Sequence, residues 1–226
     1  MRHLFAGTLM SAVRAALATL LVCGLLYPLA LTAIGQLIFP FEANGSLLRA
    51  GDGTVVGSRL IGQQWNGAQW FHGRPSATSA TDPSDPSKVV PAPYNASNSG
   101  GSNLGPTNKR LMERLVADRA SLQSVQPELV GKTLPADMLT TSASGLDPHI
   151  SPENAALQLA RVARARNADP ARLPTLVQQY AAARSFWVFG EPRVNVLELN
   201  LALQRACPLI EEHPASRECG YAAPNN

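Results

Sequence analysis

The sequence has little charge and few aromatic residues. Charged residues make up 15% of the 226 positions, aromatic residues 6%, and the formal net charge is +3. A nucleic-acid-binding surface needs basic residues gathered on one face and interleaved with aromatic ones, and no such pattern occurs here. We therefore expect no nucleic-acid partner.

Cysteine is scarce, and its spacing argues against a metal site. Cys23, Cys207 and Cys219 form no Cys-x-x-Cys pair and have no histidine at metal-ligand spacing, so we expect no bound metal. Two interpretations of Cys207 and Cys219 stay open. They form a disulfide if this part of the chain is exported to an oxidising compartment, or they remain two thiols.

Motifs for phosphate binding and nucleophilic catalysis are missing as well. Gly100 and Gly101 are not followed by the lysine of a phosphate-binding loop, so the polar run 94–108 either holds an anion or simply forms turns. Ser144, Asp147 and His149 are the residue types of a hydrolytic triad, but no Gly-x-Ser-x-Gly elbow surrounds the serine. We interpret His149 as a loop residue and expect no enzymatic activity of the chain's own.

One long apolar run is present near the N-terminus. No charged residue occurs between Arg14 and Glu42, and the run 15–34 has roughly the 20 apolar residues that cross a bilayer. We expect a transmembrane helix over 15–41. A cleaved signal peptide is the alternative, but its apolar region is shorter and Phe41-Glu42-Ala43 is a poor cleavage site.

The apolar run also predicts an orientation and a contact. Arg2 and Arg14 precede it without an acidic residue, so residues 1–14 should stay in the cytoplasm and the remainder should be translocated. Pro28 cannot donate a backbone hydrogen bond to Gly24, which predicts a kink in the helix. We expect Gly24 and Pro28 to meet a partner inside the membrane.

The rest of the chain has the pattern of a single α+β domain over 42–205, followed by a tail over 206–226. An exposed, mobile loop is expected over 78–93 and an apolar link over 185–190. The segment 193–203 alternates like a strand, but we favour a helix capped by Asn195. The remaining expectations are strands over 46–48, 55–61 and 134–141, and helices after Thr107, over 151–167 and after Asp169.

The helix over 151–167 has the strongest signals. Ser151 can cap it, Pro152 suits the first position, and Glu153 complements the helix dipole. Its small apolar residues should pack inward, whereas the polar residues should point elsewhere, as a solvated face or to grip phosphates or acidic groups of a partner. The inward residues are Ala155, Leu159, Val162 and Ala163, and the polar ones are Gln158, Arg161, Arg164 and Arg166.

Six ordered sequence blocks resemble the C subunit of bacterial Kdp-type potassium-transporting ATPases. The resemblance runs from the apolar run to about Arg205, and the tail from Ala206 departs from it. The matching blocks are Leu60 to Gln63, Phe71 to Ala77, Tyr94 and Asn95 with Ser99 to Gly105, Ser142 to Ser151, Arg161 to Ala163, and Gly190 to Asn200.

The resemblance implies a non-catalytic, single-span accessory subunit in the bacterial inner membrane, with lipid around its span. The orientation that Arg2 and Arg14 predict would place its main domain in the periplasm. Its implied partners are a channel-like potassium-translocating subunit, a P-type ATPase subunit and a small membrane peptide. The family is described as a catalytic chaperone that raises the ATP affinity of the pump subunit. The nucleotide-contacting candidates that match are Gln63, Ser99, Gly100, Gly101, Ser102, Asn103, Ser144, Gly145, Leu146 and Asp147.

A nucleotide role conflicts with the orientation that the arginines predict, because ATP is scarce outside the cell. We therefore also consider that the exported domain caps the potassium entrance, with Gly24, Pro28, Arg74 and Arg161 as partner contacts. A different class of function stays open: a membrane-anchored exported enzyme or solute-binding module that acts alone.

Overall fold

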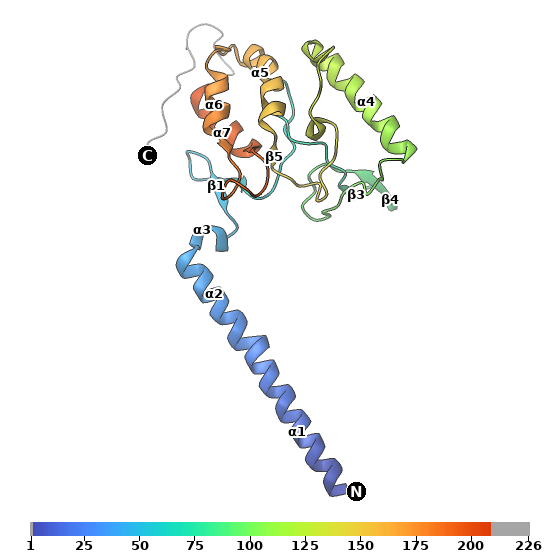
Figure 1. Cartoon of the computed structure of the whole chain (residues 1–226), viewed down its shortest axis with the longest axis vertical. Coiled ribbons are helices and arrows are strands. Elements are labelled where there is room, and N and C mark those ends of the chain that lie inside the picture. Colours follow the sequence, from blue (N-terminus) through green and yellow to red (C-terminus); the bar gives the residue numbers. More distant parts are fainter. Residues whose placement is uncertain (1, 209–226) are drawn as a thin grey trace. The chain divides into compact units, whose positions relative to one another are not determined.

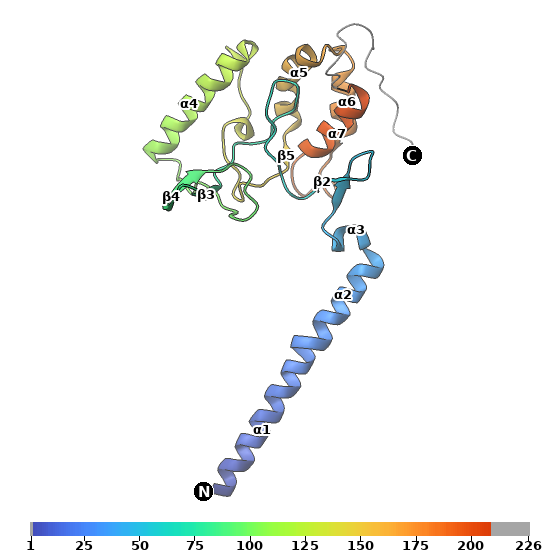
Figure 2. The same ribbon diagram turned by 180° about the vertical axis from the view of Figure 1, so that it is seen from behind.

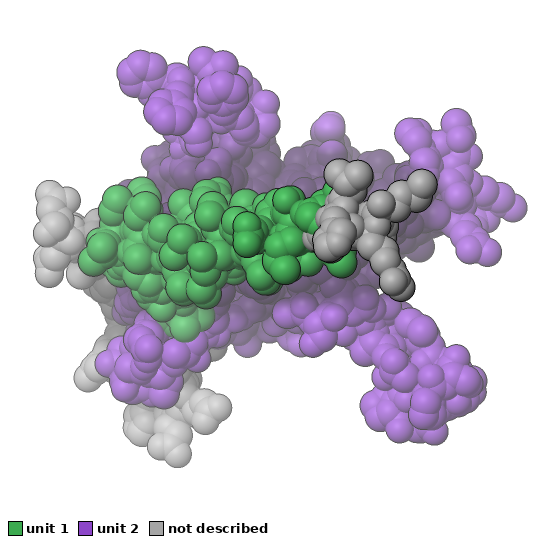
Figure 3. Space-filling view, turned by 90° about the horizontal axis from the view of Figure 1, so that it is seen from below, with its two compact units in different colours: residues 1–48 green, residues 49–226 purple. Residues whose placement is uncertain are grey.

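The computed structural model describes residues 2–208 (Figure 1). The chain divides into two compact units, residues 1–48 and residues 49–226 (Figure 3). Cys207 is disulfide-bonded, and Cys219, its expected partner, lies outside the described residues.

The N-terminal unit is almost entirely helical, as the apolar run predicts. Residues Gly7–Ile38 form a helix long and apolar enough to cross a membrane, and none of its most apolar stretch is buried in the protein. This fits a single-pass membrane protein. The helical elements are α1 (Arg2–Leu21), the π-helical turn η1 (Val22–Leu26), α2 (Tyr27–Ile38) and α3 (Pro40–Ala43).

A π-helical turn, η1, lies just before Pro28, and the kink expected there stays a prediction. Pro28 has no N–H to donate to Gly24, and in the turn just before it the Tyr27 amide donates to Val22, five residues back. After α2, the Asn44 side chain donates to Gln36 Oε1 at 2.9 Å and to the Pro40 carbonyl at 2.7 Å, which fixes the turn into α3.

The second unit is a mixed α+β domain, which confirms the expected fold class. Its sheets are small: β1 pairs with β2, β3 with β4, and β7 lies between β5 and β6. The strands are β1 (Leu47–Arg49), β2 (Val55–Ser58), β3 (Ser79–Asp82), β4 (Asp85–Pro91), β5 (His149–Ile150), β6 (Ala181–Ala182) and β7 (Arg193–Asn195).

The helices of this unit fall into two groups (Figures 1 and 2). Helices α5, α6 and α7 pack together, whereas α4 stands apart and contains no buried residue. They are α4 (Lys109–Val125), the 3₁₀ turns η2 (Pro127–Leu129) and η3 (Ala136–Met138), α5 (Pro152–Arg166), α6 (Leu173–Gln179) and α7 (Val196–Ala206).

Two of the four α-helices described in this unit, α5 and α7, begin at the expected capping residue. Helix α6 was expected after Asp169 but begins at Leu173, and no side chain caps it. The Ser151 hydroxyl accepts from the Asn154 amide at 3.1 Å and begins α5, and Asn195 Oδ1 accepts from the Glu198 amide at 3.1 Å and begins α7. Only Arg193–Asn195 of the alternating segment is a strand. The cap of α4 is Asn108 rather than the neighbouring Thr107, because its side chain accepts from the Arg110 amide.

Three segments differ from expectation. The expected loop 78–93 contains the β3–β4 hairpin, because Asp82 Oδ1 accepts from the Ser84 amide at 2.8 Å and closes the turn. The expected strand over 134–141 is the turn η3, because Thr140 donates to the Ala136 carbonyl through its amide and its hydroxyl. The expected apolar link 185–190 is a tight reversal with a Ser185–Phe189 bridge.

The core lies between α5, α6, α7 and the three-stranded sheet. Phe71, Ile150, Val162, Val194 and Leu203 are among its fully or almost fully buried members. At 25 cal/mol per Å² of apolar area, each such side chain contributes roughly 1.5–3 kcal/mol on burial. These contacts anchor the segments that carry the polar loops.

The expectation for the polar face of α5 is partly wrong. Gln158, Arg161 and Arg166 are 3%, 5% and 7% exposed, and of the four polar residues only Arg164 points outward as expected. The polar residues are buried because backbone carbonyls of residues 67–72 face this helix and need donors.

Candidate functional site

Two polar segments that are far apart in sequence meet in the domain, residues 99–103 and residues 141–147. The Gly100 amide donates to the Ser144 carbonyl at 2.8 Å, and the Ser99 hydroxyl donates to the same oxygen at 3.0 Å. Thr141 Oγ1 donates to Ser102 Oγ at 3.3 Å. We call this contact the loop junction.

Glycine is required at the loop junction because the two backbones approach closely. A Cβ atom on Gly101 would lie 2.8 Å from the Ala143 carbonyl oxygen. Gly145 has a φ of +67°, and a Cβ there would lie 2.5 Å from Thr78 Cγ2 and 2.6 Å from the Gly100 carbonyl oxygen. The glycine pattern therefore serves the packing of one loop on the other.

Ser76 and Tyr94 join a third segment to the loop junction. The Ser76 hydroxyl donates to the Gly145 carbonyl at 2.7 Å and accepts from the Tyr94 amide at 3.0 Å, and the Tyr94 hydroxyl donates to the Arg74 carbonyl at 2.7 Å. Burial, followed by the charge of Asp147, raises the pKa of Tyr94 to about 12. The phenol therefore stays protonated at neutral pH.

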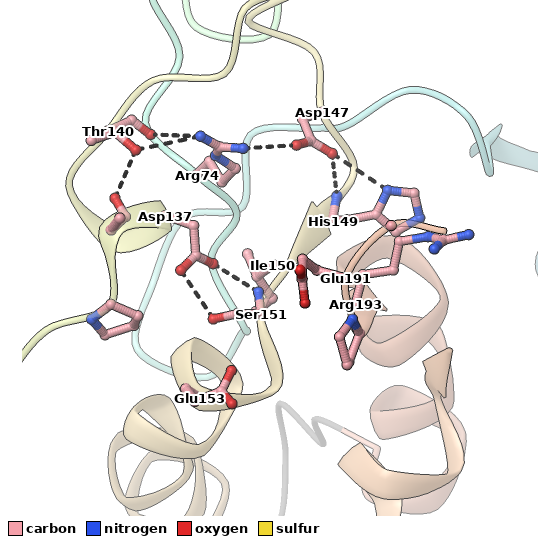
Figure 4. Close-up of a pocket in the computed structure, with 14 residues that line it drawn as sticks. Arg74, Asp137, Thr140, Asp147, His149, Ile150, Ser151, Glu153, Glu191 and Arg193 are labelled. Atoms are coloured by element: carbon pink, nitrogen blue, oxygen red, sulfur yellow. Dashed lines mark hydrogen bonds and ion pairs between the residues drawn. The ribbon is translucent and has the colours of Figure 1, made fainter. Parts of the chain in front are cut away.

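Asp147 links the junction to Arg74 and His149 (Figure 4). Arg74 Nη1 lies 3.1 Å from Asp147 Oδ2, and the His149 amide donates to Asp147 Oδ1 at 3.0 Å. Burial alone would raise the pKa of Asp147, but the hydrogen bonds from His149 and the Arg74 charge outweigh it, and the pKa lies below its ordinary value. Asp147 is therefore an ionised carboxylate whose oxygens are bonded to Arg74 and His149.

An open pocket of about 630 Å³ lies beside this group (Figure 4). Asp137 forms part of its wall, and its carboxylate accepts from the Ser151 amide at 2.7 Å, from the Ser151 hydroxyl at 3.0 Å and from Asn154 Nδ2 at 2.9 Å. These bonds hold the start of α5 in place. The acidic and basic residues that line the pocket are Arg74, Asp137, Asp147, His149, Glu153, Glu191 and Arg193.

Ser144 and His149 are not joined as a triad would require in the part of the chain that the structure describes. Ser144 Oγ accepts from the Leu146 amide at 3.1 Å, and no hydrogen bond joins it to His149 within residues 2–208. In that same range, no cluster of three His, Cys, Asp or Glu side chains could hold a metal ion.

The structure brings most of the expected nucleotide-contacting residues to the loop junction, but Gln63 is engaged elsewhere. Gln63 Nε2 donates to the Val56 carbonyl at 2.8 Å. Its neighbour Gly62 makes the link to the junction, because its amide donates to the Leu146 carbonyl at 2.7 Å. Asn103 is exposed, with a φ of +51°.

The expected partner contacts have different environments. Gly24 and Pro28 are exposed on the apolar helix. Arg74 is half-buried and bonded to Asp147, Thr140 and Thr141. Arg161 is interior, so a partner contact through its guanidinium would require the domain to open. The guanidinium donates to the carbonyls of Ala68 and Trp70 and to the side chains of Gln126 and Gln158.

His72 lies next to Arg161 in this interior group. Its Nε2 lies 2.8 Å from the Gly67 carbonyl oxygen, which fits a neutral ring that donates from Nε2. Burial and then repulsion from Arg161 lower the pKa of His72 below 6.5. Burial also lowers the pKa of Arg161 to about 10, so Arg161 remains charged at neutral pH.

Three structurally central polar residues were not singled out by sequence reasoning: Asp137, Gln126 and Asn200. Asn200 is fully buried and bonds the backbone of Phe71. A signal for it existed, because it falls on the same helical face as the apolar residues Val196 and Leu203. Asp137 and Gln126 bond to groups distant in sequence, and nothing local marks them.

Comparison with known proteins identifies the family. Residues 9–205 match the family described as "K+-transporting ATPase, c chain". The chain belongs to the KdpC family. This confirms the resemblance drawn from the six sequence blocks, and the match extends over the apolar helix and the loop junction.

Several KdpC relatives are similar over nearly their whole length, and each is named potassium-transporting ATPase KdpC subunit. A relative from Rhodopseudomonas palustris (strain BisB18) is 56% identical over 84% of this chain and 94% of its own. One from Methylobacterium nodulans is 56% identical over 81% and 89%. One from R. palustris strain CGA009 is 53% identical over 87% and 96%.

Proposed function

We propose that the chain is the single-span accessory subunit of a potassium-transporting ATPase in the bacterial cell membrane. Its partners are a channel-like potassium-translocating subunit, a P-type ATPase subunit and a small membrane peptide. The domain is periplasmic, stabilises the assembled complex and caps the potassium entrance. The family match supports membership of the complex.

The observation that carries the capping role is the internal closure of the loop junction. The Gly100 amide, the Ser99 hydroxyl and the Gly145 carbonyl, all from the segments that resemble a nucleotide signature, are bonded within the domain. Asp147 is likewise occupied by Arg74 and His149. A rigid surface of this kind suits docking on a partner, because little ordering entropy is lost on binding.

The capping role is tested by removing the domain while the span is kept. A chain lacking residues 45–226 is produced with its partner subunits, and co-purification and the potassium concentration for half-maximal ATPase activity are measured. The expected result is weaker assembly or a higher half-maximal concentration. Unchanged values for both would contradict the proposal. Full-length Gly105→Ala serves as the control, because a Cβ there meets nothing within 4 Å.

The orientation has its own test. Ser84→Cys places a thiol in the exposed turn between β3 and β4, and a maleimide that cannot cross membranes is applied to intact spheroplasts. We expect labelling without permeabilisation, compared with the parent chain that lacks this cysteine. Labelling only after the membrane is opened would place the domain in the cytosol and overturn the capping role.

A second candidate function, raising the ATP affinity of the pump subunit, is favoured by one observation. Of its matching residues, Ser99, Gly100, Ser102, Ser144 and Gly145 gather at one junction. It predicts that Ser144→Ala or Gln63→Ala raises the KM for ATP in the assembled complex and leaves the potassium dependence unchanged. The capping role predicts no change in the KM for ATP.

A further inference from the structure

Four consecutive large apolar side chains project from the domain at residues 186–189, which we call the aromatic tip. Phe186, Trp187, Val188 and Phe189 are 87%, 90%, 71% and 67% exposed. None of them belongs to the hydrophobic core. Scattered apolar residues on a surface are ordinary, but a continuous run of this size marks a site of interaction.

The backbone of the aromatic tip is held in a conformation that disfavours large side chains. Phe186 has a φ of +51° and Trp187 a φ of +61°. Tight reversals with two successive left-handed residues usually carry Asn and Gly there, which meet less steric hindrance. Two aromatic residues at these positions cost stability and gain no packing within the domain. An interaction outside the domain accounts for them.

The tip is closed on itself by hydrogen bonds. The Ser185 amide donates to the Phe189 carbonyl and the Phe189 amide to the Ser185 carbonyl, both at 2.9 Å. The amides of Trp187 and Val188 also donate to carbonyls at the base of the turn, each at 3.3 Å. Four of the five amides of residues 185–189 are therefore bonded within the turn, which lowers the cost of entering an apolar medium compared with an open loop.

Chain connectivity limits how far the domain can lie from a bilayer that the apolar helix crosses. The apolar helix ends at Ile38, and the second unit begins at Arg49. Eleven residues reach at most about 40 Å when fully extended, so the domain stays beside the membrane that the span crosses. Residues 184–193 contain two arginines and one glutamate. Arg184 Nη2 lies 2.5 Å from Glu191 Oε2, so the segment has a net charge of +1, which adds at most a weak attraction to anionic headgroups.

From these observations we infer that the aromatic tip inserts into the interfacial region of the lipid bilayer and forms a second membrane contact of the domain beside the span. Phe and Trp are the residues that favour this region, where the rings lie among the headgroups and upper acyl chains. A partner protein would offer a pocket instead, but an exposed tip with most of its amides bonded within the turn fits lipid better. The inference holds for either leaflet, so it does not depend on the orientation proposed above.

The tryptophans of the chain provide a direct test. The chain has Trp65, Trp70 and Trp187, and none lies in the apolar helix. The full-length protein is reconstituted into vesicles of phosphatidylcholine and phosphatidylglycerol, with or without phospholipid brominated in the upper acyl chain, which quenches nearby tryptophan. We expect brominated lipid to quench the wild-type fluorescence and Trp187→Phe to lose that quenching.

Two further variants separate insertion from other causes. Trp65 and Trp70 remain in Trp187→Phe, so any quenching that survives reports those rings rather than the tip. Phe186→Ser with Phe189→Ser keeps Trp187 but removes the neighbouring apolar rings, and its quenching should fall below that of the wild type. Folding of each variant is checked by near-ultraviolet circular dichroism.

Equal quenching in the wild type and in Trp187→Phe, or no quenching in either, would overturn the inference. A second result would also overturn it: in the assembled complex, neither brominated lipid nor aqueous acrylamide quenches Trp187. That result would mean that a partner protein covers the tip. A failed assembly test with intact Trp187 quenching would reject the proposed function and leave this inference standing.

Discussion

Asn200 on α7 makes a closed pair of hydrogen bonds with the backbone of Phe71, 129 residues earlier. Its Oδ1 accepts from the Phe71 amide at 2.9 Å, and its Nδ2 donates to the Phe71 carbonyl at 2.9 Å. Both residues are fully buried. One polar side chain thereby holds the segment that carries the aromatic core residue against the C-terminal helix.

Asn200→Leu should destabilise the domain strongly. The substitution removes both bonds and leaves a buried N–H and C=O without partners, each costing about 1–3 kcal/mol. We expect the free energy of unfolding of the full-length chain in detergent, from urea titration, to fall by roughly 2–5 kcal/mol. Asn66→Ala, at an exposed asparagine, is the control, and an equal loss there would refute a special role of Asn200.

Gly145→Ala should break the loop junction. The new Cβ would lie 2.5 Å from Thr78 Cγ2 and 2.6 Å from the Gly100 carbonyl oxygen, at a φ of +67°. We expect a loss of about 2–4 kcal/mol in the free energy of unfolding, from overpacking and backbone strain together. Gly105→Ala, in the same polar run but with open space around it, should stay close to wild type. A stable Gly145→Ala would mean that the two loops are not tightly packed.

Asp137→Ala should loosen the start of α5. The carboxylate accepts three hydrogen bonds from Ser151 and Asn154, and bonds to a charged group contribute about 1.5–3 kcal/mol. We expect a loss of roughly 2–4 kcal/mol in the free energy of unfolding and faster hydrogen exchange of the first turn of α5. Glu113→Ala, on an exposed acid of α4, is the matched control. Unchanged exchange in α5 would contradict the role given to Asp137.

His72 should make the domain less stable in mild acid. Because its pKa in the folded protein lies below the ordinary 6.5, the unfolded chain binds a proton first. The stability from the neutral ring is complete above pH 6.5 and is lost as the pH falls below it. His72→Gln should flatten the dependence of unfolding free energy on pH between 6.5 and the lowered value. The difference in unfolding free energy between the wild type and His72→Gln above pH 7, where the ring is neutral, gives the cost of losing the contact with the Gly67 carbonyl.

Protonation of Asp147 at a pH below the ordinary carboxyl pKa of 3.8 should weaken the loop junction. Its pKa lies below 3.8 in the folded protein, so its contribution is present above 3.8 and is lost as the pH falls through the folded value. Asp147→Asn should remove that part of the acid dependence, measured as unfolding free energy against pH. If Asp147→Asn leaves the fall in unfolding free energy at acid pH unchanged, the carboxylate does not stabilise the folded state.

Local signals in the sequence predicted the apolar helix, the fold class and the starts of α5 and α7. The helix follows from hydropathy alone, because a bilayer selects composition and length. Ser151 and Asn195 cap their helices through side-chain bonds to amides three residues away, an interaction that the order of residues specifies directly. The same locality explains why the approximate position of α4 was predictable.

Only the tertiary structure decided which polar residues are interior and which loops meet. The amphipathic pattern predicted that Arg161 lies on the outer face of α5. In the structure its guanidinium is buried, because it donates hydrogen bonds to the carbonyls of Ala68 and Trp70, more than ninety residues earlier. The contact of Gly100 with Ser144 is of the same kind. Local propensity cannot specify such pairs, because the benefit of a buried hydrogen bond exists only after the apolar core has brought both partners out of water.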